Sequence, residues 1–202
     1  MKLSSFFSLL LAPILLVTVA YGQPSKPVKD YINVKGPIRF DNISYSLSWS
    51  SHPSAQLYKQ EYIVKGGQSD KYKTMILMDV ITGNTRIEDV VSGKVLELKN
   101  IKAGNPMVNY ELLEKNGETM IDFLLSANSP DGKTINIVEH NVYRYKKVTN
   151  KSGQKAVLLF GVSKRGYGND ITSFLTNLKS TKSELLNKVG RYNIPEIIWP
   201  AQ

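Results

Sequence analysis

The chain has 202 residues, 42% of them hydrophobic, and a formal net charge of +9. This length suits one sizeable domain, or at most two small ones, and the hydrophobic content is sufficient to build its core. The chain contains no cysteine, which excludes disulfide bonds, thiolate metal sites and cysteine nucleophiles.

Residues 1–22 are typical of a cleavable export signal. An apolar run follows Lys2, and the small residues Ala20 and Gly22 precede the predicted cut. We therefore expect a secreted or periplasmic protein whose mature chain begins with a short flexible leader, residues 23–30. No later segment approaches the ~18 consecutive apolar residues of a membrane-spanning helix, so we expect no transmembrane segment in the mature chain.

The first part of the domain is predicted to contain four strands, at 38–40, 43–50, 57–64 and 74–81. In residues 43–50 apolar side chains alternate with serines, the period-2 pattern of a strand with one buried face. Asp41 and Asn42 tolerate positive φ and therefore predict a tight hairpin before this strand. The pattern stops at residues 51–54, which we expect to form a loop.

A helix is predicted next, because the apolar residues between Ile87 and Ile101 fall on one helical face. Thr85 and Glu88 have the spacing of a capping box at its start, in which each side chain satisfies the backbone N–H of the other. The sequence Gly104-Asn105-Pro106 predicts its end.

Four more strands are predicted at 107–114, 118–126, 134–148 and 154–163. Asn116-Gly117, a strong hairpin signal, connects the first two. Asp170 can cap a C-terminal helix. We predict a break in this helix near Ser180, because an unbroken helix would place Lys182 at the centre of its apolar face.

This order of elements predicts an α+β fold. Strands joined by short turns pair antiparallel, so we expect one antiparallel sheet of about eight strands, with an N-terminal hairpin, covered by two main helices. The order contains no βαβ unit, and the crevice in which open parallel sheets bind nucleotides is therefore not expected. The predicted domain spans residues 31–190, and residues 191–202 form a C-terminal tail.

The features that support a family resemblance are the hairpin at 40–49, the helix at Thr85, the Asn116-Gly117 hairpin, and the run from Lys155-Ala-Val-Leu-Leu-Phe160 to Phe174-Leu-Thr-Asn-Leu178. In this order they resemble the PsbP/Mog1/DcrB-like group over residues 38–179. The resemblance implies a sandwich of helices on an antiparallel sheet and a binding or accessory role without catalysis. No residue motif matches, so no binding residues are carried over. A cystatin-like or NTF2-like curved sheet is the nearest competing architecture.

Positive charge is concentrated near the C-terminus. Residues 144–191 contain eleven basic and two acidic residues. Such a segment favours contact with an anionic surface, such as lipid headgroups or a cell-wall polymer, although ordinary solubilising charge is the alternative. An exported protein is not expected to meet nucleic acid, so an anionic envelope polymer or a protein is the expected partner.

One candidate binding segment is the glycine-rich stretch from Lys164 to Asp170. It precedes the predicted helix and supplies Lys164, Arg165 and Tyr167, which together with backbone N–H groups suit recognition of an acidic group. The alternative is a plain strand-to-helix connection.

A second candidate is formed by Tyr143, Tyr145 and Lys147, which share one face of a predicted strand. Aromatic rings beside a cation suit glycans or single-stranded nucleic acid. The alternative is that these are ordinary core or surface side chains of the sheet.

His52 is the remaining candidate, because a hydrolase would need a histidine beside a serine and a carboxylate. His140 follows Glu139 in a strand, so the two side chains should face opposite sides of the sheet. The sequence has no HExxH motif, clustered histidines or calcium loop, so we predict no metal site and no cofactor. We expect a non-catalytic binding domain; a small secreted hydrolase centred on His52 is the alternative.

Overall fold

The computed structural model describes residues 27–200, and the predicted export signal lies outside them. The strands are β1 (Ile38–Phe40), β2 (Ile43–Ser54), β3 (Leu57–Val64), β4 (Thr74–Thr82), β5 (Asn109–Lys115), β6 (Glu118–Asn128), β7 (Ile135–Thr149) and β8 (Lys155–Tyr167). The helices are α1 (Ile87–Gly104), α2 (Ile171–Arg191) and a short 3-10 helix, Gly168–Asp170. In this part of the chain no helix combines the length and hydropathy needed to cross a bilayer.

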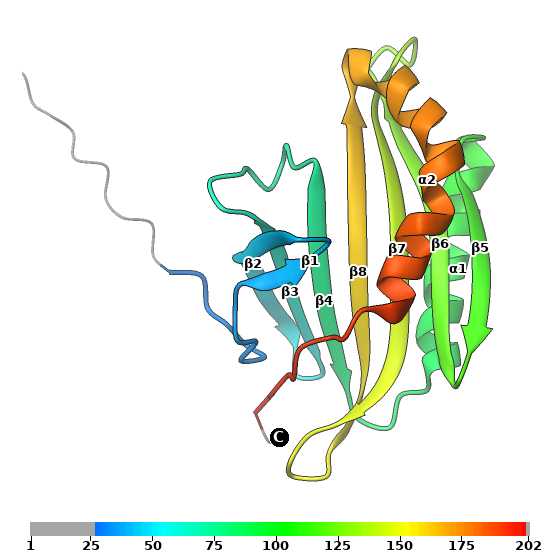
Figure 1. Cartoon of the computed structure of the whole chain (residues 1–202). Coiled ribbons are helices and arrows are strands. Elements are labelled where there is room, and N and C mark those ends of the chain that lie inside the picture. The colour runs from blue at the N-terminus through cyan, green and yellow to red at the C-terminus, as the bar shows by residue number, and fades with distance from the viewer. Residues whose placement is uncertain (1–26, 201–202) are drawn as a thin grey trace, which may run out of the picture.

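All eight strands form one antiparallel sheet in the order β1-β2-β3-β4-β8-β7-β6-β5. The N-terminal strands β1–β4 therefore join the C-terminal strands through the pairing of β4 with β8. The sheet is strongly twisted, with α2 in front of it and α1 behind (Figure 1). The predicted α+β class and the single antiparallel sheet with two helices are confirmed.

The two faces of the sheet carry separate hydrophobic cores. On the α2 face, Leu185 and Val189 of α2 pack against residues such as Phe160 of β8. On the α1 face, Ile87 and Leu98 of α1 pack against residues that include Leu159 of β8. Because both faces of β8 are covered, its sequence is an almost continuous apolar run rather than an alternating one.

Both predicted tight turns are present. Asp41 and Asn42 have φ values of 51° and 62°, and Asn116 and Gly117 have values of 55° and 74°. Two consecutive positive φ angles match the twist of an antiparallel hairpin, which explains the choice of Asn, Asp and Gly at these positions.

Strand β2 differs from the prediction in two ways. It continues to Ser54, so the predicted loop at 51–54 is wrong and His52 lies within the strand. A register shift between Leu47 and Trp49 also interrupts the alternation of faces. Tyr45 is buried, whereas Trp49 beyond the shift is exposed, because an extra residue in a strand moves the following side chains to the other face.

Helix α1 ends at Gly104 as predicted, but the predicted capping box is wrong. The N-cap residue is Arg86, and no side chain within residues 27–200 caps the helix there. Arg86 instead donates from Nε and Nη2 to the carboxylate of Asp89, at 2.9 and 2.6 Å.

Helix α2 is unbroken from Ile171 to Arg191, so the predicted break near Ser180 is wrong. Lys182 does not have to be buried, because its ammonium reaches Glu111 of β5, with Nζ 2.9 Å from Oε2. Asp170 precedes the helix, but its carboxylate pairs with Lys73 at 2.6 Å and makes no capping hydrogen bond.

The C-terminal tail packs on the α2 face beside the N-terminal segment (Figure 1). Ile197 and Trp199 are buried there. The N–H of Ile198 donates to the carbonyl oxygen of Ile32 at 2.8 Å, and Asn33 Nδ2 donates to the carbonyl oxygen of Ile198 at 3.0 Å. The two ends of the described chain thus hold each other on the sheet.

Candidate functional site

The glycine-rich segment does not form the predicted recognition loop. Strand β8 continues to Tyr167, and Lys164 and Arg165 pair with His140 and Glu139 of β7 in the antiparallel ladder. Their side chains therefore lie on opposite faces of the sheet, and their backbone groups belong to a strand rather than to an anion-binding loop.

Arg165 and Tyr167 do come together, around Tyr72 on the α1 face. The Arg165 guanidinium pairs with Glu139 and lies 4.1 Å above the ring of Tyr72. The Tyr72 hydroxyl donates to Glu139 Oε2 at 2.7 Å, and the Tyr167 hydroxyl donates to the Tyr72 carbonyl oxygen at 2.8 Å. These contacts neutralise the charge of Arg165 within the domain, and burial raises the pKa of Tyr72.

Tyr143, Tyr145 and Lys147 share the α1 face, as their spacing requires. Tyr145 is fully buried in the core and offers no ring for a ligand to stack on. Tyr143 is half-buried, with its ring edge-on to Phe123 at 4.8 Å. Burial raises the pKa of Tyr143 well above its ordinary value. Lys147 is exposed.

His52 belongs to a surface stack of aromatic rings. Its ring lies flat on Tyr58, with centroids 4.1 Å apart and planes 3° from parallel, and Tyr31 packs nearby. Its Nδ1 is 3.0 Å from the carbonyl oxygen of Leu57. This arrangement gives the imidazole a packing role and lends no support to a hydrolase centred on it.

A groove between α1 and strands β3–β4 forms a hollow on the α1 face. We call it the α1 groove; its volume is about 510 Å³. It exists because α1 packs over β5–β8 and leaves the β3–β4 part of this face open. Ligand pockets are typically about 300–1,000 Å³ and mostly apolar. The groove is lined by residues of the β2–β3 hairpin, β4, α1, β7 and β8: Ser54, Gln56, Leu57, Lys59, Leu77, Asp79, Ile81, Asp89, Val90, Gly93, Lys94, Glu97, Tyr143, Tyr145 and Leu159.

Gly161 shapes the floor of the α1 groove. It pairs with Leu77 on one side and with Tyr143 on the other. A Cβ atom at this position would lie 2.9 Å from Cδ1 of Tyr143, a distance that real side chains do not tolerate. Only glycine lets the Tyr143 ring lie over the strand at this position. The floor of the groove therefore consists of tyrosine and aliphatic side chains.

Ion pairs form both rims of the α1 groove. On the sheet side, Lys59 and Asp79 are direct cross-strand partners, with Nζ 2.6 Å from Oδ2 and the Asp79 side chain only 13% exposed. On the helix side, Lys94 pairs with Glu97 at 2.8 Å and lies 5.7 Å from the Tyr143 ring centroid. Burial raises the pKa of Asp79, and the nearby Lys59 ammonium opposes part of that rise.

The Asp79 carboxyl should make stability fall as pH rises. Because its pKa is raised in the folded state, the folded chain holds this proton to higher pH than the unfolded chain does. Below about pH 4 both states are protonated; above it the unfolded chain ionises first and is stabilised. We therefore expect the free energy of unfolding of Asp79→Asn to increase relative to that of the wild type as the pH rises from 4 to 7, measured by urea unfolding.

Asp131→Asn provides a control of opposite sign. The hydroxyl of Ser129 and the backbone N–H of Lys133 hold the pKa of Asp131 below its usual value. The native carboxylate is therefore stabilising above that pKa, and the variant should lose stability relative to the wild type as pH rises. If Asp79→Asn also loses stability relative to the wild type as the pH rises, the conclusion that burial raises the pKa of Asp79 is contradicted.

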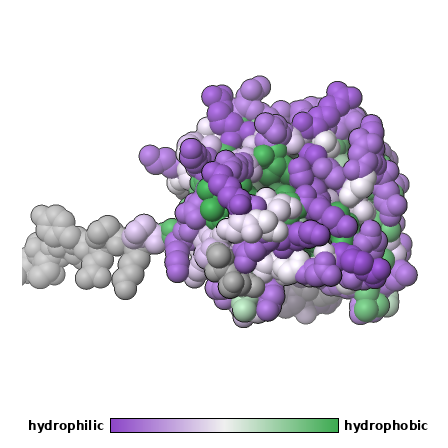
Figure 2. All heavy atoms as spheres, turned by 90° about the horizontal axis from the view of Figure 1, so that it is seen from below, coloured by the Kyte–Doolittle hydropathy of each residue, from purple (hydrophilic) through white to green (hydrophobic). Residues whose placement is uncertain are grey.

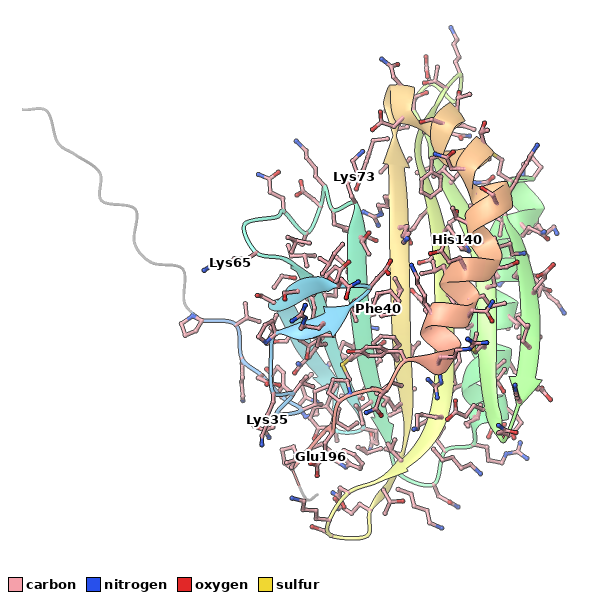
Figure 3. All side chains as sticks on the ribbon, in the orientation of Figure 1. Lys35, Phe40, Lys65, Lys73, His140 and Glu196 are labelled. Atoms are coloured by element: carbon pink, nitrogen blue, oxygen red, sulfur yellow. The ribbon has the colours of Figure 1, made fainter. Side chains whose placement is uncertain are left out.

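A second polar cluster lies under α2. His140 Nε2 is 3.2 Å from Oδ1 of Asp122 on β6, and Figure 3 shows His140 beneath α2. This confirms that Glu139 and His140 face opposite sides. Asp122 is 4% exposed, Lys182 Nζ stands 3.8 Å from its Oδ1, and its Oδ2 has no hydrogen-bond partner among the described residues. The adjoining cavity holds only about 140 Å³.

Sequence reasoning missed the α1 groove, although one signal pointed to it. Asp79 is the only charged residue in the otherwise apolar strand Thr74–Thr82. A carboxylate in such a strand requires a partner or a function. The partner, Lys59, alternates with the buried Tyr58 and Gln60 and so belongs to the other face of β3.

The fold and the groove together define an α+β domain with one antiparallel sheet, helices on both faces and an open hollow beside α1. A protein-family model matches residues 32–194, and the chain belongs to that family, whose description states no activity. No curated protein and no solved structure gives a significant match.

Proposed function

We propose that this protein is an exported, non-catalytic binding domain that holds an anionic amphiphile of the cell envelope. The apolar part of the ligand occupies the α1 groove, and its anionic group contacts lysines beside the end of the groove that Ile81 lines. The observation that carries the proposal is the groove itself, about 510 Å³ in volume, with an apolar and tyrosine floor between charged rims.

The floor of the groove suits an acyl chain. Leu77, Leu159 and Ile81 line it, and transfer of a CH₂ group from water to such a surface gains about 0.8 kcal/mol. The lysines on the rims are already paired with Asp79 and Glu97, so the interior of the groove is close to neutral. An uncharged chain therefore suits the interior better than an ionic group does.

Two lysines lie beside the end of the groove that Ile81 lines. Lys147 pairs with Val157, which belongs to the core of the α1 face, and Lys155 is two residues before Val157 in β8. Both lysines therefore lie on the α1 face, near the β7–β8 turn. Both are exposed, and within residues 27–200 neither forms an ion pair. Figure 2 views this end and shows apolar areas among hydrophilic residues.

The basic C-terminal segment contributes less charge than its composition indicates. Acidic side chains neutralise six of its eleven basic residues: Arg144, Lys146, Lys151, Arg165, Lys182 and Lys188. Of the other five, Lys164 lies on the α2 face and Lys179 and Arg191 lie in α2, whereas Lys147 and Lys155 lie on the α1 face. We therefore assign the anionic group to Lys147 and Lys155. Export and the resemblance to the PsbP/Mog1/DcrB-like group remain parts of the proposal; the N-terminal hairpin and the C-terminal helix agree with that resemblance.

The test uses N-phenyl-1-naphthylamine, a neutral probe that fluoresces in apolar sites, and its displacement by dodecyl phosphate. Leu77→Trp fills the floor of the groove and should abolish probe binding. Ile43→Trp, an equally large change at an exposed position on β2, should leave binding intact. Far-UV circular dichroism verifies that both variants are folded.

Lys147→Glu with Lys155→Glu separates the two parts of the ligand. Binding of the neutral probe should be unchanged, whereas dodecyl phosphate should compete at least tenfold less well and lose its salt dependence. Equal probe binding by the two tryptophan variants would contradict the groove as the binding site. Unchanged competition by dodecyl phosphate in the double lysine variant would contradict the role of Lys147 and Lys155.

A further inference from the structure

Strand β5 is an open edge of the sheet. Among residues 27–200 it pairs only with β6 and is the outermost strand on its side (Figure 1). Its outer edge therefore presents unpaired backbone N–H and C=O groups along seven residues. Leu112 and Leu113 in its centre are 47% and 37% exposed. A long edge with exposed apolar side chains is a surface for strand pairing.

We propose that two copies of this chain pair through β5, antiparallel, about a two-fold axis at Leu113. The two sheets then form one continuous sheet, and each surface patch meets its own copy, as in other two-fold dimers. In this register Glu111 of each copy, which also pairs with Lys182 of its own chain at 2.9 Å, lies directly opposite Lys115 of the other. Two identical ion pairs therefore flank the central Leu113–Leu113 contact.

The charges select this register. A two-fold axis perpendicular to the sheet leaves each side chain on its own face, so the axis must pass through a residue of β5. An axis at Glu111 opposes two like charges, and an axis at Leu112 leaves Lys115 opposite Asn109. Only the axis at Leu113 pairs opposite charges directly, which stabilises neighbouring strands.

The opposite face supplies apolar contact. The register places Leu112 of the second copy beside Glu114, which lines a hollow of about 420 Å³ between β5 and α1. Leu96 of α1, an exposed residue, lines the same hollow. The α1 groove lies on the other side of α1, so the dimer leaves it open and does not depend on the proposed ligand.

Sedimentation equilibrium of the purified protein tests the dimer. The wild type should have twice the mass of one chain at micromolar concentration. Lys115→Glu should weaken the dimer by roughly tenfold, because it replaces two attractive pairs by two repulsive ones. Glu111→Lys with Lys115→Glu restores opposite charges between the copies, although it removes the Lys182–Glu111 pair within each chain, and should restore the dimer relative to Lys115→Glu alone.

Lys133→Glu, an equal change of charge in the exposed β6–β7 turn, is the matched control and should leave the dimer unaffected. A monomeric wild type at 100 µM overturns the proposal. So does a Lys115→Glu variant that dimerises as tightly as the Lys133→Glu control, because the register would then not depend on this ion pair.

Discussion

Replacing Trp199 by alanine is expected to lower the free energy of unfolding by about 3–5 kcal/mol, the usual range for removing a large aromatic side chain from a core. Trp199 is 3% exposed and belongs to the core of the α2 face. Its loss would also loosen the neighbouring tail, because the Ile198 backbone pairs with Ile32 and Asn33. Urea unfolding followed by far-UV circular dichroism measures the change.

Trp199→Phe is the matched variant. The indole Nε1 is buried and has no hydrogen-bond partner among the described residues. Phenylalanine retains most of the apolar area and removes this unsatisfied donor, so its stability should lie within about 1 kcal/mol of the wild type. A Trp199→Ala variant as stable as Trp199→Phe would show that the tail does not belong to the core.

Arg144→Ala is expected to cost about 3 kcal/mol of unfolding free energy, because it removes one partner from a largely buried network. The Arg144 side chain is 12% exposed, and its Nε lies 2.5 Å from Glu118 Oε2. Its Nη1 donates to the carbonyl oxygens of Val189 and Tyr192, at 3.2 and 2.9 Å, where α2 ends. It thus caps the helix and ties it to the sheet.

Lys146→Ala controls for charge. Lys146 reaches the same acid, Glu118, from 3.8 Å and is about one-third exposed. Exposed pairs of this kind contribute less than about 1 kcal/mol. Equal losses in the two variants, measured by urea unfolding, would mean that general attraction to Glu118, and not the hydrogen bonds to the end of α2, accounts for the role of Arg144.

Most of the elements could be predicted because their signals are local. Asn116 and Gly117 adopt the positive φ angles that their side chains permit, and the strands on either side follow. The change of period at Ile87 likewise marks α1, and its core contacts confirm the helical face.

The errors arose where distant residues decide the structure. Nothing near Lys182 in the sequence shows that Glu111 stands within reach of its ammonium, and without that partner a break in α2 was the reasonable prediction. The register shift after Leu47 depends on pairing with β3. Arg165 looked free in the sequence, but Glu139 and Tyr72 bind it in the folded sheet.

In the candidate site too, local features could be predicted from the sequence and contacts between distant residues could not. Tyr143 and Tyr145 could be placed on one face from their spacing alone. The α1 groove could not be predicted, because it needs β3 beside β4, β4 beside β8, and a helix that covers only part of the face. Asp79 could be recognised as unusual within its strand, but its partner Lys59 comes from another strand.

The most direct test of the α1 groove is a titration of the ¹⁵N-labelled protein with dodecyl phosphate, followed by NMR. Amide shifts should concentrate at Lys59, Leu77, Lys94 and Tyr143, with smaller shifts at Lys147, and should saturate at one ligand per chain. Shifts confined to α2 and the C-terminal tail, with these groove residues unchanged, would contradict the groove as the binding site.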